Sequence, residues 1–141
     1  MNLNDYDDDD SGTILRVAIA DDHKLLADAV SSMLGGDEGF ETSCCYDLES
    51  LLKLLGRDKF DIVLLDLRMP GMSGLDSVAQ VVRAARDGHV VLFTGQVDRH
   101  VLDKAIELGV RGLIAKTMPL RSLGSIIELI CSGQIFVPVG A

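Results

Sequence analysis

Short apolar runs alternate with amphipathic segments along most of the chain. Five runs predict strands, at 14–20, 40–46, 61–66, 89–94 and 112–116. The runs at 61–66 and 89–94 are almost continuously aliphatic, which is typical of central parallel strands buried on both faces. The more polar run at 40–46 favours a position nearer the edge of the sheet.

Between the strands, apolar side chains recur at the spacing of one helical face. Five helical segments follow from this pattern, at 25–34, 48–55, 75–82, 101–106 and 120–130. Because parallel crossovers are right-handed, this order predicts an α/β fold with a (βα)5 doubly wound, five-stranded parallel sheet. Glycines near the ends of the segments predict where the helices stop: Gly35-Gly36, Gly56, Gly88, Gly109 and Gly133.

The chain has 141 residues, which predicts one domain at 13–133. Residues 1–12 hold five Asp and no Lys or Arg, so we expect a disordered acidic tail there. Residues 134–141 are interpreted as an exit segment or the start of a linker. The net charge is −9, which disfavours unaided binding to a phosphate backbone.

Neither membrane nor disulfide chemistry is indicated by the sequence. No apolar run approaches the ~20 residues that span a bilayer. The N-terminus has no basic and apolar regions of a secretory signal, so we expect a cytoplasmic location. The three cysteines lack metal-ligand spacing and are interpreted as small buried hydrophobes: Cys44, Cys45 and Cys131.

Polar residues stand where four of the predicted strands end. Asp21 and Asp22 follow the first strand, Asp66 ends the third, Thr94 ends the fourth and Lys116 ends the fifth. The second strand contributes only the pair "YD" at 46–47. Because the carboxyl ends of parallel strands meet at one edge, we expect these groups to lie together, where ligands bind in such sheets.

The chemistry of this group indicates phosphoryl transfer. Three carboxylates repel one another unless a cation joins them, and hard oxygen ligands suit Mg²⁺. A carboxylate oxygen can act as a nucleophile, and Mg²⁺ with the Lys116 ammonium would neutralise the transferred charge. The Thr94 hydroxyl can hydrogen-bond a phosphoryl oxygen. The competing interpretation of Asp66, a helix N-cap, is disfavoured because the next helix is predicted to begin only near Ser73–Leu75.

At this point the sequence resembles the response-regulator receiver domains of two-component signalling. The resemblance covers roughly residues 14–133, with a flavodoxin-like receiver fold. Its motifs occur in the family's order: the pair "DD" at 21–22, Asp66 in "LLDLRMPGMSGLD", "TG" at 94–95, and Lys116 after "GVRGLIA". Each motif is weak alone, whereas all of them at the ends of the correct strands form a specific signal.

The resemblance implies a role for each acid. Asp66 would accept a phosphoryl group from a phosphohistidine on a sensor histidine kinase or a phosphotransfer protein. Asp22 and Asp66 would bind Mg²⁺ directly, together with the backbone carbonyl of Arg68. Asp21 would act through a metal-bound water.

The resemblance also implies how the signal leaves the site, with two departures from the family pattern. Lys116 would pair with the phosphoryl oxygens, and Thr94 would swing toward them. Many receivers carry an aromatic residue three positions before the lysine, where this chain has Leu113. Many also have a cis proline after the lysine, whereas Thr117 follows here and predicts a trans bond.

Three further residues have alternative interpretations. Arg68 and Gln96 lie two positions after Asp66 and Thr94, where the family's residues flank the attacking water during dephosphorylation. They are either rate-tuning residues or ordinary solvated loop residues. His23 stands beside two acids, but an exposed first-turn residue is the simpler interpretation.

The output is the least determined property. The stretches "ADDHKLL" and "LRSLGSIIELICSGQIFVPVGA" resemble receivers that carry a LuxR-type helix-turn-helix domain, which would follow this chain. DNA would then be bound only through that missing domain, and signal would pass through the surface formed by 101–106, 112–116 and 120–130, with a homodimer on phosphorylation. The alternatives are a stand-alone receiver and a degenerate receiver that acts as a protein-interaction module.

We expect a switch that catalyses only its own phosphorylation and autodephosphorylation and no other reaction. Two unrelated functions are alternatives to this interpretation. A haloacid-dehalogenase-type phosphatase resembles this chain in its nucleophilic Asp but has a second acid where "DLR" places Arg68. A flavodoxin-like FMN carrier would need a phosphate-binding loop after the first strand, where the acidic pair would repel the phosphate.

Overall fold

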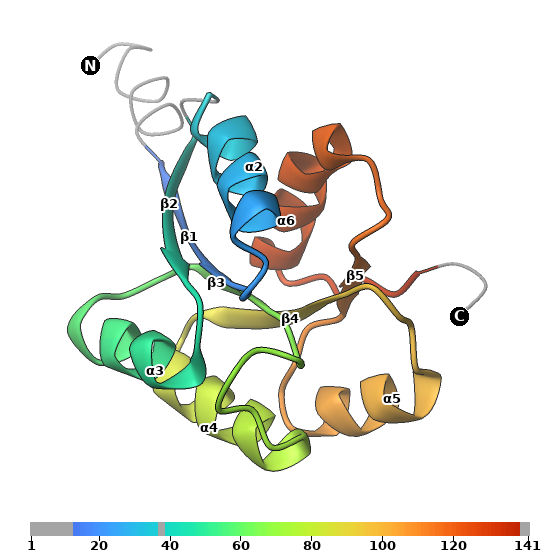
Figure 1. Cartoon of the computed structure of the whole chain (residues 1–141). Coiled ribbons are helices and arrows are strands. Elements are labelled where there is room, and N and C mark those ends of the chain that lie inside the picture. Colours follow the sequence, from blue (N-terminus) through green and yellow to red (C-terminus); the bar gives the residue numbers. More distant parts are fainter. Residues whose placement is uncertain (1–12, 37–38, 139–141) are drawn as a thin grey trace, which may run out of the picture.

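The computed structural model describes residues 13–36 and 39–138, and the predicted acidic tail at 1–12 lies outside them. Five parallel strands form one sheet in the order β2-β1-β3-β4-β5 (Figure 1). The predicted (βα)5 doubly wound α/β fold is confirmed, and the polar strand β2 lies at an edge as expected. The strands span Leu15–Ala20 (β1), Phe40–Cys45 (β2), Ile62–Leu65 (β3), His89–Thr94 (β4) and Leu113–Ala115 (β5).

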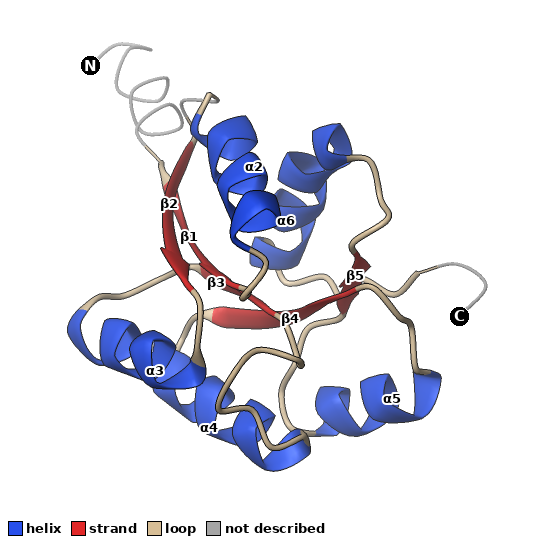
Figure 2. Cartoon of the chain, viewed as in Figure 1, coloured by secondary structure: helices blue, strands red, loops and turns tan. Residues whose placement is uncertain are grey.

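Helices cover both faces of the sheet. Figure 2 shows α2 and α6 on one face and α3, α4 and α5 on the other. A short 3-10 turn leads into the last helix. The bounds are Lys24–Gly35 (α2), Leu48–Arg57 (α3), Leu75–Ala85 (α4), Arg99–Glu107 (α5), Leu120–Ser122 (η1) and Leu123–Cys131 (α6).

The central strand β3 shows how the aliphatic pattern builds two cores. All four of its residues are buried. Val63 and Leu65 pack into the layer under α3, α4 and α5, whereas Ile62 and Leu64 pack into the layer with α2 and α6. Alternate residues of a strand point to opposite faces, so a strand buried on both sides must be apolar throughout. Each such side chain contributes about 1.5–3 kcal/mol on burial.

Helix ends follow the predicted glycines only in part. Gly109 and Gly133 come just after α5 and α6, with φ of 113° and 108°, the left-handed conformation that ends many helices. Gly56 does not stop α3, which continues to Arg57. α4 ends at Ala85, before the predicted Gly88. A glycine ends a helix where the chain must turn left-handed, and Gly56 has no such φ.

The exit segment, residues 134–138, returns to the edge of the sheet. Phe136 forms a parallel bridge with Gly112, and its carbonyl accepts a hydrogen bond from the Leu113 N–H at 2.9 Å. The Phe136 N–H donates to the Arg111 carbonyl at 3.0 Å. A Cβ added at Gly112 would lie 1.9 Å from the Phe136 carbonyl oxygen, so only glycine permits this approach. The exit segment is therefore hydrogen-bonded directly to the start of the edge strand β5.

The cysteines agree with the predicted role to different degrees. Cys45 is buried, whereas Cys44 and Cys131 are half-buried, and all three are free thiols. Burial raises the pKa of Cys45 and of Cys131 to about 11. None of the helices within the described ranges has the length and apolar character needed to cross a membrane.

Candidate functional site

The predicted polar residues meet at the carboxyl edge of the sheet. Asp21 and Asp22 follow β1, Asp66 follows β3, Thr94 ends β4 and Lys116 follows β5. The edge lies at the switch in strand order between β1 and β3, where doubly wound sheets bind ligands. The residues that the sequence predicted to lie together therefore do lie at one edge of the sheet.

Sheet hydrogen bonds hold the backbone of these residues in place. The Asp21 N–H donates to the Cys45 carbonyl at 3.0 Å, and the Asp66 N–H donates to the Ala20 carbonyl at 2.9 Å. Lys116 is held in the same way, by a 2.8 Å bond to the last carbonyl of β4. The acids and the lysine thus extend the rigid ladder of the sheet, which fixes their relative positions.

Lys116 forms ion pairs with two buried acids. Its Nζ lies 2.7 Å from Asp21 Oδ2 and 3.2 Å from Asp66 Oδ2. Asp21 is completely buried, Asp66 is 2% exposed and the Lys116 side chain is 14% exposed. One positive charge therefore serves two buried carboxylates, which leaves the cluster negative even before Asp22 is counted. The family resemblance predicts Lys116 against phosphoryl oxygens, and this direct pairing with two acids was not expected from the sequence.

Both buried carboxylates are also oriented by their own loops. Asp21 Oδ1 accepts from the His23 N–H at 2.9 Å, and Asp66 Oδ1 accepts from the Arg68 N–H at 3.0 Å. Each is a short turn in which a carboxylate bonds the backbone two residues further on. α4 begins at Leu75, so Asp66 does not cap it and the N-cap interpretation is excluded.

The acids form a group that could hold a metal ion. Potential ligand atoms of Asp21, Asp22, His23 and Asp66 all lie within 4.8 Å of one another. The buried Asp21 Oδ2 forms no hydrogen bond within the described residues and has only its ion pair. The fit favours a hard cation such as Mg²⁺, because the donors are chiefly carboxylate oxygens and their charge exceeds what Lys116 neutralises.

His23 lies nearer the acids than the sequence indicated. It precedes the first turn of α2 as its N-cap residue, and its Nδ1 is 3.5 Å from Asp21 Oδ1 and 3.9 Å from Asp22 Oδ1. The ring is largely exposed, as predicted. A neutral imidazole suits softer metals better than Mg²⁺, so the carboxylates remain the main candidate ligands.

The Thr94 hydroxyl forms hydrogen bonds with its own loop. It donates to the Gln96 carbonyl at 3.1 Å and accepts from the Gln96 N–H at 3.2 Å. Gln96 and Arg68 both have exposed side chains. The hydroxyl thus ties down the start of the loop that leads to α5.

Leu113 replaces the aromatic residue of the family pattern with a buried aliphatic one. It packs among the side chains beneath α3, α4 and α5. No cis peptide bond occurs in the described ranges, so the Lys116–Thr117 bond is trans as predicted. Both departures from the family pattern therefore persist in the fold.

Comparison with known proteins gives consistent results. A family model described as "Response regulator receiver domain" matches residues 17–128. The chain is 36% identical over 125 residues to the glycerol metabolism activator of Pseudomonas putida, covering 87% of this chain and 57% of that protein. It is 29% identical over 125 residues to response regulator GacA of Pseudomonas aeruginosa, covering 88% of this chain and 58% of that protein.

A solved structure shows the same fold. The receiver domain of the stress response regulator RcsB from Escherichia coli, in its non-phosphorylated form, superposes with a TM-score of 0.81 at 21% identity. The match covers 89% of this chain and 99% of that one. The chain spans 57% to 58% of the length of the two curated relatives above.

Proposed function

This chain belongs to the response regulator receiver domains and is a signalling switch, and we propose that phosphorylation of Asp66 controls it. The observation that carries the proposal is the cluster itself: three acids whose ligand atoms lie within 4.8 Å, with one lysine bridging two of them. This arrangement leaves a negative site that gains from a cation and then from a phosphoryl group. The donor is a phosphohistidine on a sensor histidine kinase or a phosphotransfer protein.

The chemical step uses a carboxylate oxygen of Asp66 as nucleophile. The oxygen attacks phosphorus, the new O–P bond forms as the P–N bond of phosphohistidine breaks, and the imidazole leaves with a proton. Lys116 Nζ is already 3.2 Å from Asp66 Oδ2, so a small movement would pair it with a phosphoryl oxygen. Asp21, at 2.7 Å from the same ammonium, keeps it in place during that exchange.

The metal would be held by the acidic group. We assign direct contacts to Asp22, Asp66 and the backbone carbonyl of Arg68, and a water-mediated contact to Asp21. When bound, Mg²⁺ would supply charge neutralisation for the transferred phosphoryl group. The side chains of Arg68 and Gln96 would tune how fast water removes the phosphoryl group, and the protein would catalyse no other reaction.

The signal would leave through the edge of the sheet. The Thr94 hydroxyl would release the Gln96 backbone and turn toward the phosphoryl group, while Lys116 moves with the end of β5. Leu113 has no aromatic ring that could rotate as Thr94 moves. Its N–H, however, donates to the Phe136 carbonyl at 2.9 Å. We infer that β5 passes its movement to the exit segment through this backbone contact, alongside the surface of α5, β5 and α6.

The output we propose is transcriptional. Relatives of this chain are longer than it is, which is compatible with a DNA-binding domain beyond the exit segment. Such a protein would act in the cytoplasm and could pair with a second copy on phosphorylation. The alternative output is a stand-alone or degenerate receiver that binds other proteins, but a degenerate site would lack an acid or the lysine, and all are present here.

Intact-mass spectrometry after incubation with acetyl phosphate and Mg²⁺ tests the proposal. The wild-type chain should gain one phosphoryl group, and peptide mapping should place it on Asp66. Asp66→Ala should gain none, whereas Asp76→Asn, a change at an exposed acid in the first turn of α4, should be modified as the wild type is. A wild-type chain that stays unmodified, or an equally modified Asp66→Ala variant, would refute phosphorylation control.

A further inference from the structure

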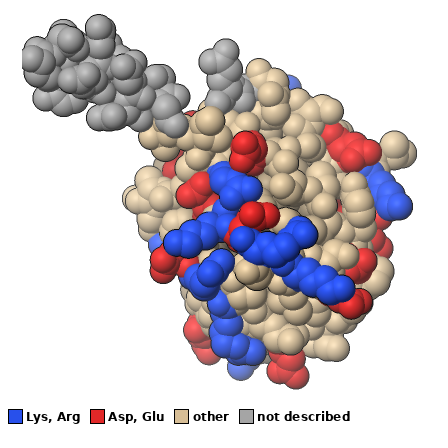
Figure 3. Space-filling model, turned by 90° about the vertical axis from the view of Figure 1, so that its left-hand side faces the viewer, with Lys and Arg blue, Asp and Glu red and all other residues tan. Residues whose placement is uncertain are grey.

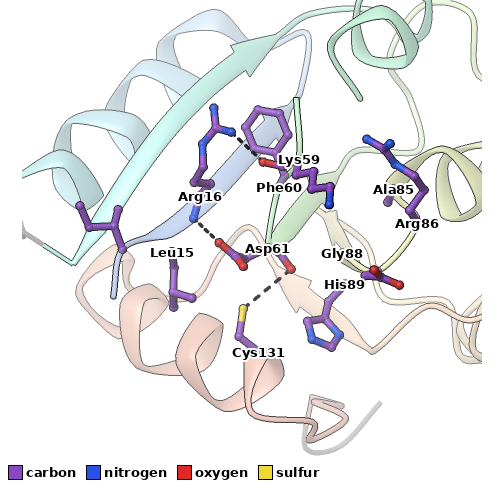
Figure 4. A pocket seen from close by; sticks show the side chains of 12 residues that line it. Leu15, Arg16, Lys59, Phe60, Asp61, Ala85, Arg86, Gly88, His89 and Cys131 are labelled. Carbon is purple, nitrogen blue, oxygen red and sulfur yellow. Dashed lines mark hydrogen bonds between the residues drawn. The ribbon is translucent and has the colours of Figure 1, made fainter. Parts of the chain in front are cut away.

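A pocket lies at the amino-terminal edge of the sheet, opposite the acidic cluster. It has a volume of about 470 Å³, which is within the range of small-molecule sites. The first residues of β1 and β4, the loop before β3, the turn after α4 and the end of α6 form its walls (Figure 4). None of the residues that line the pocket belongs to the acidic cluster, so a ligand here would not occupy the proposed phosphorylation site.

Basic side chains surround this pocket, although the chain carries a net charge of −9. Arg16, Lys59 and Arg86 all line it, and Lys and Arg gather on this side of the molecule with acids among them (Figure 3). Arg16 is already paired, with its Nε 2.9 Å from Glu41 Oε1. Lys59 and Arg86 are exposed and have no ion pair within the described residues.

Two acids also line the pocket, and they differ in availability. Asp61 Oδ2 accepts a 2.7 Å hydrogen bond from the Arg16 N–H, so this carboxylate supports the sheet edge. Asp87 is exposed beside Arg86 and has no ion pair within the described residues. The Asp87 carboxylate would repel a ligand that carries several anionic groups. The pocket therefore suits a ligand with a single anionic group.

The turn that presents Arg86 is conformationally strained. Arg86 has φ 56° and ψ −112°, and it is the one non-glycine residue with positive φ in the described ranges. The Gly88 N–H closes the turn on the Ala85 carbonyl at 2.8 Å, so Arg86 holds a position that glycine normally takes in a type II′ turn. Strained backbone of this kind is found preferentially at active sites, ligand-binding sites and switch regions.

The guanidinium of Arg86 is also held in place. One of its nitrogens donates to the Leu55 carbonyl at 3.1 Å, and its other N–H groups donate no hydrogen bond within the described part of the chain. The Lys59 backbone is fixed in turn, because its carbonyl accepts from Arg16 at 2.8 Å. A guanidinium that is already held in place loses less freedom on binding an anion than a mobile side chain would.

We propose that this pocket binds a small organic anion. Its carboxylate or phosphate head contacts Lys59 and Arg86, and its apolar body packs against Leu15 and the half-buried Cys131 side chain. The pocket lies at the edge of the sheet opposite to Asp66, so binding of the anion does not require phosphorylation of Asp66. Retention of a strained arginine at the rim of a pocket, where glycine would fit without strain, is the observation that distinguishes this site from an ordinary surface hollow.

Nuclear magnetic resonance of the full chain without Mg²⁺ tests this, with phenyl phosphate, benzoate and neutral benzyl alcohol as probes. We expect saturable shifts at 59–61, 86–89 and Cys131 with one or both anions and none with benzyl alcohol. Phenyl phosphate against benzoate distinguishes a phosphate from a carboxylate head. Lys59→Ala should weaken binding about tenfold. Lys53→Ala, at an exposed lysine of α3, should bind as the wild type does.

Arg86→Gly gives the sharper test because relief of the backbone strain should raise Tm, whereas loss of the guanidinium should weaken anion binding. The variant should melt a few degrees above the wild type and bind the anion at least about tenfold more weakly. Arg86→Lys keeps the charge and the strained backbone, so it should show no gain in Tm. Unchanged binding by Arg86→Gly, or a lower Tm, would overturn the proposal.

One competing occupant is the chain's own acidic segment at 1–12, which ends two positions before the pocket-lining Ile14 in the sequence. If anions shift the pocket resonances only in a chain that lacks 1–12, that segment is the occupant and the small-anion proposal is wrong. Equal binding by both chains supports a small anion.

Discussion

At the carboxyl edge of the sheet Asp21, Asp66 and Lys116 are buried or nearly so and are paired with one another, whereas at the amino edge Lys59 and Arg86 are exposed and have no ion pair within the described residues. Lys116 is 14% exposed and contacts two acids, while Lys59 is exposed and contacts none within the described residues. Burial makes each charge at the carboxyl edge depend on its partners, because an unpaired buried charge is strongly unfavourable. Exposure lets the bases of the amino edge remain unpaired at little cost, ready for a ligand.

The two edges therefore respond differently when one charge is removed. The acidic cluster is a mutually dependent unit that should change stability as well as function. The basic rim, Lys59 and Arg86, consists of exposed side chains without ion pairs in the described residues. Removing either charge should weaken ligand binding, and stability should change only where the strained backbone at Arg86 is relieved as well. Three experiments test this contrast, in decreasing order of expected effect.

The largest effect is expected from removing the lysine of each edge. Lys116→Ala leaves Asp21 and Asp66 buried without a countercharge, and should lower the free energy of unfolding by about 3 kcal/mol at neutral pH. Lys59→Ala removes an exposed charge and should change it by less than about 0.5 kcal/mol. Urea unfolding followed by circular dichroism measures both. Equal losses would show that the cluster is no more interdependent than the rim.

Adding Mg²⁺ should stabilise the protein through the carboxyl edge only. At ten times its Kd, Mg²⁺ should add about 1.4 kcal/mol and raise Tm, because it relieves the repulsion among the acids. Thermal unfolding with and without Mg²⁺, against NaCl of matched ionic strength, checks this. The gain should vanish in Asp22→Asn and persist in Lys59→Ala. A gain of the same size with NaCl would mean general screening rather than a site.

The smallest contrast concerns two thiols, one at each edge. Burial raises the pKa of Cys45, which ends β2, and that of Cys131, beside the basic rim, to about 11 in both cases. The raised pKa means that these thiols contribute stability fully present below the unfolded value of 9.0 and lost as the pH rises through about 11.

Alkylation by iodoacetamide at pH 8.5 measures the same property in the folded protein. Both thiols should react at least about tenfold more slowly than in urea, because little thiolate forms. Fast alkylation of Cys131 would contradict a raised pKa for that thiol.

Much of the fold and of the acidic site could be predicted from the sequence for a physical reason. A parallel strand buried on both faces must be apolar throughout, so an aliphatic run such as 61–66 can be recognised in the sequence as a central strand. The carboxyl ends of parallel strands share one edge, so Asp66 and Lys116 were expected together although fifty positions separate them. Local composition and the geometry of the sheet are sufficient for both conclusions.

What only the tertiary structure decided depends on distances between separate elements. The 2.7 Å contact between Lys116 and Asp21, the close approach of Phe136 to Gly112 and the strained turn at Arg86 have no periodic signal. The end of α3 beyond Gly56 belongs to the same class, because a glycine stops a helix only where the surrounding chain requires a left-handed turn. The sequence by itself determined which edge carries the acids and the lysine. Packing in three dimensions decided how these side chains pair, how the exit segment hydrogen-bonds to the edge of the sheet at β5, and that the opposite edge holds a pocket.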